Sequence, residues 1–191
     1  MAPSRCCGRR AGWARLHKVL LDRLEAGAAF AGTAPRWTAA LFPQKGELAD
    51  RAEPDRGKPG TKHSVLTETE GAPLGLTLGP ANQHDSKPTE ATLDAVPPVS
   101  GGRRGRPRRR PKKLHAYTAS RGRSVRQTLR KRAITPRIAR PGMDSSKHLG
   151  CHRWVIGRTL ARMVRFRRLT VGYERRADIH LAFVTLAAAL I

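Results

Sequence analysis

The sequence predicts an α/β fold with a small mixed sheet flanked by helices, and three observations support this. Two short segments, 62–69 and 73–78, lie on either side of a turn at Glu70-Gly71-Ala72, which is typical of a β-hairpin. Helical spacing of apolar residues recurs towards both ends of the chain, in 12–27 and 146–190. A length of 191 residues allows one domain with a moderate core, although aromatic residues make up only 5% of the chain.

The first predicted element is a helix from Gly12 to Gly27. Its predicted apolar face consists of Leu16, Val19, Leu20 and Leu24. The next segment, 28–54, is rich in Ala, Gly and Pro and shows little periodicity, so we expect it to be poorly ordered. Pro35 and Pro43 argue against a central strand in this segment, because proline cannot donate a hydrogen bond to a neighbouring strand.

A short helix is expected after the hairpin. Asp85 or Ser86 is positioned to cap its N-terminus, and the helix is expected to run through Ala95 and to stop before Pro97-Pro98. Four elements are predicted in the C-terminal half: a basic amphipathic helix at 123–132, a strand at 134–138, a long helix at 146–168 and a last helix capped by Asp178. The apolar faces predicted for the last two helices are Leu149, Ile156, Leu160 and Met163, and Ile179, Phe183, Leu186 and Leu190.

Positive charge is concentrated in one block. The whole chain has a formal net charge of +24, and residues 103–176 contain 25 of the 38 basic residues but only 2 of the 14 acidic ones. The loop at 100–112 is predicted to be extended and disordered, because Pro and Gly alternate with repelling charges. Such a concentrated positive field favours a polyanionic partner. Codon bias is an alternative explanation, because GC-rich DNA encodes many Arg, Ala, Gly and Pro residues. The loop is thus either a solvated segment or an arm that contacts phosphates.

Several functional classes are not expected. No apolar stretch reaches the roughly 18 to 20 residues that span a bilayer, and no secretory signal is evident, so we expect a cytoplasmic protein without membrane contact. The three cysteines form no CxxC pair, and His148, Cys151 and His152 lack an identifiable fourth ligand for zinc. Neither a phosphate-binding GxxxxGK[ST] loop nor a serine, histidine and acid arrangement for acyl transfer stands out.

Several motifs together resemble bacterial insertion-sequence transposases of the DDE type (actinobacterial-type), whose fold is ribonuclease H-like. They are DRGKPGTKH from Asp55, ANQHD from Ala81, KLHA from Lys113, HRWVIGRTLARMVRFRRL from His152 and RRADIHLAF from Arg175. The resemblance implies a truncated ribonuclease H-like domain. It divides the chain into a degenerate N-terminal segment, 1–54, with one linker helix at about 12–26, and a remnant of the catalytic domain, 55–191.

The resemblance also predicts where the family's catalytic carboxylates belong. In the family, two Asp and one Glu hold the divalent metal ions, usually Mg²⁺, that catalyse DNA strand transfer. The corresponding positions here are Tyr117, Gly157 and a position near Arg36, none of which carries a carboxylate. We therefore expect an inactive copy with no bound metal cofactor, and Asp55, Asp85, Asp94 and Asp144 are not expected to rebuild the triad.

What remains is an expected DNA-binding protein of transposition and recombination, associated with the nucleoid. The basic residues expected to face DNA are Arg103, Arg104, Arg106, Arg108, Arg109, Arg110, Lys112, Lys113, Arg153, Arg158, Arg165, Arg167 and Arg168. For Arg158 and Arg162, a solvated helix surface is an equally good interpretation. Two alternatives stay open: a dominant-negative partner of an intact transposase, and a decayed reading frame without function.

Overall fold

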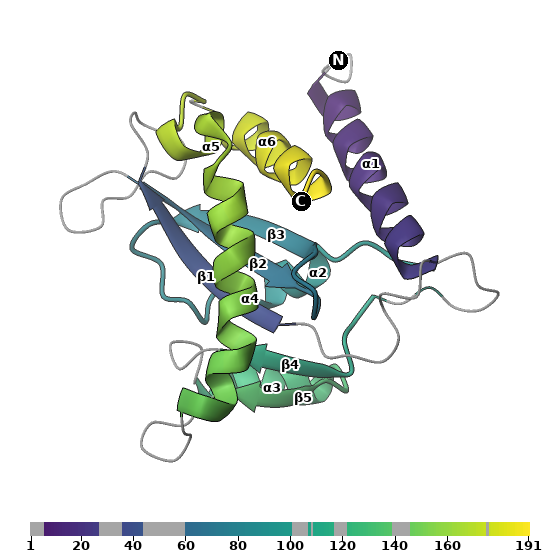
Figure 1. The fold of residues 1–191 in the computed structure, drawn as a ribbon, viewed down its shortest axis with the longest axis vertical. Helices are drawn as coiled ribbons and strands as arrows, with labels where there is room; N and C mark the ends of the chain where they lie inside the picture. Colours follow the sequence, from purple (N-terminus) through teal and green to yellow (C-terminus); the bar gives the residue numbers. More distant parts are fainter. Residues whose placement is uncertain are drawn as a thin grey trace.

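A computed structural model of the chain contains a five-stranded sheet with helices on both faces (Figure 1). It describes residues 6–26, 36–43, 60–100, 107, 109–116, 122–138, 146–174 and 176–191. This arrangement confirms the predicted α/β class. None of the helices in these ranges is long and apolar enough to cross a membrane.

The sheet is mixed. Its strands are β1 (Arg36–Pro43), β2 (Gly60–Thr67), β3 (Pro73–Pro80), β4 (Lys113–Ala116) and β5 (Thr135–Ile138), in the order β3-β2-β1-β4-β5. The neighbours β1, β2 and β3 pair antiparallel, whereas β4 pairs parallel with both β1 and β5. The sheet therefore has an antiparallel half and a parallel half that meet at β1.

The predicted hairpin is confirmed as β2 and β3. Its turn contains Gly71 with a φ of +99°, a conformation that favours glycine. A Cβ at this position would lie 2.8 Å from Oγ1 of Thr159 in the long helix, whose hydroxyl donates a 2.7 Å hydrogen bond to the carbonyl of Gly71. The turn thus positions the hairpin against a helix that lies about 88 residues further along the chain.

The prediction that 28–54 contains no central strand is wrong. Strand β1 lies in the middle of the sheet and pairs with β2 along its whole length, from Arg36 opposite Thr67 to Pro43 opposite Gly60. The two prolines fall immediately before the first residue of the strand and on its last residue. Proline is tolerated at strand ends because few ladder hydrogen bonds are lost there. The rest of 28–54 lies outside the described residues.

The described residues form six helices around the sheet. They are α1 (Cys6–Ala26), α2 (Thr89–Asp94), α3 (Arg123–Lys131), α4 (Ser146–Val164), α5 (Arg167–Val171) and α6 (Ala177–Ala189). Helix α1 packs beside α6 (Figure 1). On one face, Leu66 joins a buried cluster with residues of α2 and α3. On the other face, Val65 joins a cluster with residues of α4, α5 and α6. Adjacent residues of β2 thus serve opposite cores, as the pleat of a strand requires.

The predicted face of α1 is wrong, since Leu16, Val19 and Leu24 are exposed. That of α6 is right only in part: Phe183 packs against the cluster of Val65, but Ile179 and Leu190, which follows the helix, are exposed. The buried residues are His17 and Leu21 in α1, and His180, Val184, Ala187 and Ala188 in α6. Apolar residues occur on several sides of both helices, so spacing alone does not select the side that packs.

Three predicted helix ends also need correction. The long helix stops at Val164 rather than Arg168, and α5 follows as a separate short helix. Helix α2 begins at Thr89, and Asp85 instead pairs with Nζ of Lys62 at 2.6 Å, so it does not cap the helix. Asp178 lies within the first turn of α6, where it pairs with Arg176. By contrast, α3 and β5 confirm the predicted helix at 123–132 and strand at 134–138 within a few residues.

Part of the loop expected to be disordered is ordered. Arg110 donates a 2.9 Å hydrogen bond to the carbonyl of Arg132, and the carbonyl of Lys112 accepts one of 2.9 Å from the amide of Thr135. These contacts fix the last residues of the loop against the end of α3 and the start of β5. Residues 101–106 and 108 lie outside the described ranges.

Candidate nucleic-acid interface

The elements that carry the expected carboxylate positions lie next to one another. Strands β1 and β4 pair in parallel, with Arg36 opposite His115. Helix α4 packs across the sheet over β1 (Figure 1). The sheet therefore brings together the strand with the first expected position, the strand that leads to the second, and the helix with the third.

The third position, Gly157, provides no metal ligand. It is exposed on α4, and a Cβ built on it would meet no heavy atom within 4 Å. A longer side chain would fit at this position. Crowding by neighbouring atoms therefore does not explain why the sequence has a glycine here. The side chain of Arg36 and the whole of Tyr117 lie outside the described residues.

In the described part of the chain, the other acids do not assemble into a replacement site. Asp85 pairs with Lys62, and Asp94 pairs with Arg132 at 2.5 Å. Within the described ranges, no group of three or more His, Cys, Asp or Glu side chains is placed to hold a metal ion. Asp55 and Asp144 lie outside those ranges, as do the side chains of His148, Cys151 and His152 in α4.

The first of two groups of basic residues lies on β4, β5 and α3. Leu114, Ala116 and Ile138 pack in the buried cluster with α3, so the alternating residues Lys113 and Arg137 point to the other face of these strands. We call this group the β4–β5–α3 region and define it by the exposed residues Arg109, Lys112, Lys113, Arg123, Arg130, Lys131 and Arg137. None of these seven has an ion pair with an acid in the described part of the chain. The region combines the predicted loop residues with cations of α3 and β5 that were not predicted to face DNA. A sequence signal existed in the basic helix at 123–132, but only the fold places it beside the loop.

The acids nearest this region are already neutralised. Arg132 lies at the end of α3 and pairs with Asp94 at 2.5 Å and with Glu90 at 2.8 Å. The hydrogen bond from Arg132 lowers the pKa of Asp94, and the hydrogen bonds to Asp94 and Glu90 raise the pKa of Arg132. Asp94 and Arg132 are therefore both charged near neutral pH, and the uncompensated charge of the region belongs to its exposed Lys and Arg residues.

The second group of basic residues, the α4–α5 region, is defined by Arg158, Arg162, Arg165, Arg167 and Arg168. Arg158 donates a 2.5 Å hydrogen bond to the carbonyl of Glu70, and its guanidinium lies 4.6 Å from the ring centroid of Trp154. Arg168 pairs with Glu174 at 3.0 Å and lies 4.8 Å from the ring centroid of Phe183. Arg158 and Arg168 thus have partners within the protein, although the side chain of Arg168 is still 60% exposed. Arg162, Arg165 and Arg167 are exposed and have no ion pair with an acid in the described ranges.

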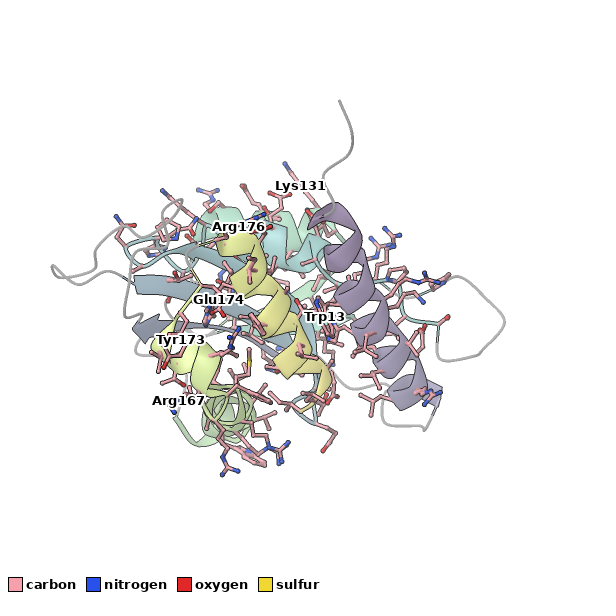
Figure 2. The ribbon with its side chains drawn as sticks, turned by 90° about the horizontal axis from the view of Figure 1, so that it is seen from above. Trp13, Lys131, Arg167, Tyr173, Glu174 and Arg176 are labelled. Atoms are coloured by element: carbon pink, nitrogen blue, oxygen red, sulfur yellow. The ribbon has the colours of Figure 1, made fainter. Side chains whose placement is uncertain are left out.

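The two basic regions are far apart, and Figure 2 shows Lys131 and Arg167 on opposite sides of the molecule. The residues predicted to face DNA therefore do not form one patch: Arg109, Arg110, Lys112 and Lys113 lie with α3, whereas Arg165, Arg167 and Arg168 lie with α5. The predicted residues Arg103, Arg104, Arg106 and Arg108, and the side chain of Arg153, lie outside the described part.

Comparison with known proteins agrees with this framework of strands and helix. Residues 37–191, which include β2 to β5 and all of β1 except Arg36, match the transposase DDE domain family. Over 137 residues the chain is 42% identical to a Burkholderia cepacia protein named "Putative transposase for insertion sequence element IS402". That match covers 72% of this chain and 64% of the relative, which is just under two thirds of its length. From its sheet, its motifs and this similarity, the chain belongs to the insertion-sequence DDE transposase family.

Proposed function

We propose that this protein binds DNA through the β4–β5–α3 region and does not cut or join DNA strands. Membership of a transposase family supports DNA as the partner. Seven exposed cations without carboxylate partners in the described chain support this surface as the contact, because uncompensated Lys and Arg release counterions from the phosphate backbone. By this proposal, binding is mainly to phosphates.

We also propose that the sheet is that of a ribonuclease H-like domain that begins at β1 and not at residue 55. Three antiparallel strands followed by two parallel ones, in the order β3-β2-β1-β4-β5, support this assignment. The family match, which starts at residue 37, supports the earlier boundary.

The observation that carries the proposed inactivity is the exposed Gly157 on α4. DDE strand transfer uses two divalent metal ions that stabilise the attacking and leaving oxygens of the phosphate. Mg²⁺ is a hard ion that requires carboxylate oxygens, and neither Gly157 nor any residue in the β1 sequence RWTAALFP supplies one. The residues present at these positions do not fit the metal ions.

A cleavage assay tests the inactivity. Supercoiled plasmid carrying the ends of the element is incubated with Mg²⁺ and with the natural protein, with Tyr117→Asp/Gly157→Glu, or with Arg36→Asp/Tyr117→Asp/Gly157→Glu. We expect no nicking by the natural protein or the double variant, since each lacks at least one acid. Nicking by either, abolished by a chelator, would overturn the proposed inactivity.

A binding titration tests the DNA contact. The protein is titrated against a duplex containing the terminal repeat of its element and against a scrambled duplex, at low and physiological salt. Equal binding to both, weakening steeply with salt, is expected for contact with phosphates alone. A preference for the terminal repeat that survives salt would instead favour a reader of element ends and a dominant-negative role. A decayed reading frame without a stable fold would give no cooperative thermal unfolding in the same preparation.

A further inference from the structure

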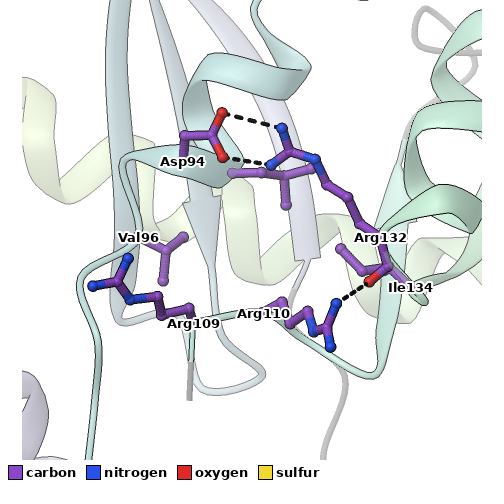
Figure 3. A pocket seen from close by; sticks show the side chains of 7 residues that line it. Asp94, Val96, Arg109, Arg110, Arg132 and Ile134 are labelled. Atoms are coloured by element: carbon purple, nitrogen blue, oxygen red, sulfur yellow. Dashed lines mark hydrogen bonds and ion pairs between the residues drawn. The ribbon is translucent and has the colours of Figure 1, made fainter. Parts of the chain in front are cut away.

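A pocket of about 230 Å³ lies beside the β4–β5–α3 region, between α2, the segment before β4 and the residues after α3 (Figure 3). It is lined by the side chains of Leu93, Val96, Arg109, Arg110, Arg132 and Ile134, together with Asp94. The pocket is therefore partly apolar and partly cationic, and it opens on the surface that we propose contacts DNA.

The apolar part of the lining is firmly held. Leu93, Val96 and Ile134 are only 5%, 8% and 2% exposed, and all three belong to the buried cluster beneath α2 and α3. Their positions are therefore set by the core. This side of the pocket is preformed and suits a small apolar or aromatic group.

Arg132 supplies a fixed planar group. Its guanidinium is held by Asp94 and Glu90, and its own backbone carbonyl accepts the hydrogen bond from Arg110 (Figure 3). Because two carboxylates already neutralise it, this guanidinium is not free to bind a further anion. A planar guanidinium held in this way is suited to stacking against a nucleobase.

Arg109 supplies the free charge. Its side chain is exposed and has no ion pair with any acid in the described ranges. A guanidinium in this state forms charge-assisted hydrogen bonds to phosphate oxygens. The pocket thus combines a site for one planar base with a cation for one phosphate.

We propose that the pocket binds a single unpaired nucleotide of DNA, with the base on the apolar side against Arg132 and the phosphate on Arg109. The inference rests on the proposed DNA contact. The volume is below the roughly 300 Å³ at the lower end for drug-sized ligands, which suits one base and not a longer ligand. A paired base cannot enter, because it must first leave the stack.

The test compares two fluorescent duplexes that differ only by one extra, unpaired thymidine in the centre of one strand. We expect the natural protein to bind the bulged duplex about fivefold or more tighter than the fully paired one, which is the lower end of the gain from stacking one base. Arg109→Gln and Lys113→Gln each remove one exposed cation beside β4. Arg109→Gln should reduce the preference for the bulged duplex, while Lys113→Gln should weaken both duplexes equally.

A second variant fills the pocket without changing charge. Val96→Phe is expected to abolish the preference and to leave binding of the paired duplex unchanged, once thermal unfolding has confirmed that it folds. Equal affinity of the natural protein for the two duplexes would overturn the proposal that the pocket binds an unpaired nucleotide, but not the proposal that the protein binds DNA. If Arg109→Gln and Lys113→Gln reduced the preference for the bulged duplex by the same amount, the proposed role of the pocket would also be overturned. Failure to bind either duplex would overturn the proposed function itself.

Discussion

The two basic regions of the molecule differ in what their cations contact. In the α4–α5 region, Arg158 holds the carbonyl of Glu70, and Arg168 pairs with Glu174. In the β4–β5–α3 region, the exposed cations have no such carboxylate partners in the described chain, since the nearby Asp94 is already bound to Arg132. Arginines thus fasten helices at two positions of the α4–α5 region, whereas Arg162, Arg165 and Arg167 there are exposed without an ion pair in the described ranges, as are the seven cations of the β4–β5–α3 region.

The largest expected effect is on DNA affinity. Lys112→Gln/Lys113→Gln/Arg137→Gln removes three exposed cations from the β4–β5–α3 region. We expect the slope of log affinity against log salt to become shallower by about 3, since each lost phosphate contact removes about 0.9. Fluorescence anisotropy of a labelled duplex, measured from 50 to 200 mM salt, gives this slope.

A matched triple variant in the other region sharpens this comparison. Arg162→Gln/Arg165→Gln/Arg167→Gln removes the same charge from exposed positions of the α4–α5 region. We expect its slope to change by less than about 1. A change as large as that of the first variant would mean that DNA also contacts the α4–α5 region, and the proposed division between the two regions would fail.

The second expected effect is a loss of stability in acid, caused by the histidines that join α6 to the sheet. Nε2 of His63 and Nε2 of His180 lie 2.8 Å apart, and the two side chains are almost fully buried. Burial lowers the pKa of His63 to about 3, helped by repulsion from His180, and burial lowers that of His180 to about 4. In the folded state these two histidines therefore stay neutral at pH values below 6.5, where histidines of the unfolded chain, with their ordinary pKa of about 6.5, become protonated.

The sign of the pH dependence follows from this difference. Between about pH 6.5 and 4 the unfolded state binds more protons, so the free energy of unfolding should fall by up to about 1.4 kcal/mol per pH unit for each histidine. Above pH 6.5 this contribution should be constant. Urea unfolding at several pH values measures it, and His180→Leu should flatten the curve whereas the exposed His84→Gln should not. A curve unchanged in His180→Leu would contradict the prediction.

A third effect concerns the turn that fastens α4. Gly71→Ala would place a side chain on a φ of +99° and a Cβ 2.8 Å from Oγ1 of Thr159. We expect a loss of about 1–3 kcal/mol in the free energy of unfolding, from backbone strain and the displaced hydroxyl. Thermal or urea unfolding checks this, and an unchanged midpoint would show that the turn does not hold α4 as the geometry indicates.

The smallest expected effect is on stability and concerns Gly157, which lies on α4, the helix that the Gly71 turn contacts. Gly157→Ala adds a methyl group to an exposed helical position with no heavy atom within 4 Å of the new Cβ. We expect a gain of about 0.5–1 kcal/mol, because alanine restricts the unfolded chain more than glycine does. Destabilisation in the same unfolding experiment would mean that Gly157 has a packing role that the structure does not provide.

Local patterns in the sequence determined several features of this protein by themselves. The turn at Glu70-Gly71-Ala72 between two short segments defined the β2–β3 hairpin, and short-range periodicity defined α3 and β5. Such elements depend on neighbouring residues and on turn chemistry, both of which are visible along the chain. Family motifs also identified the transposase ancestry, which the match over residues 37–191 confirmed.

Only the tertiary structure decided the place of β1, the buried faces of α1 and α6, and the separation of the basic regions. Strand β1 lies between β2 and β4, so its position depends on pairing with segments far along the chain. The packed side of α6 depends on the sheet that receives His180 and Val184, since the helix is apolar on several sides. Whether an arginine is free or partnered likewise depends on distant carbonyls and carboxylates, and these are brought near only when the chain folds.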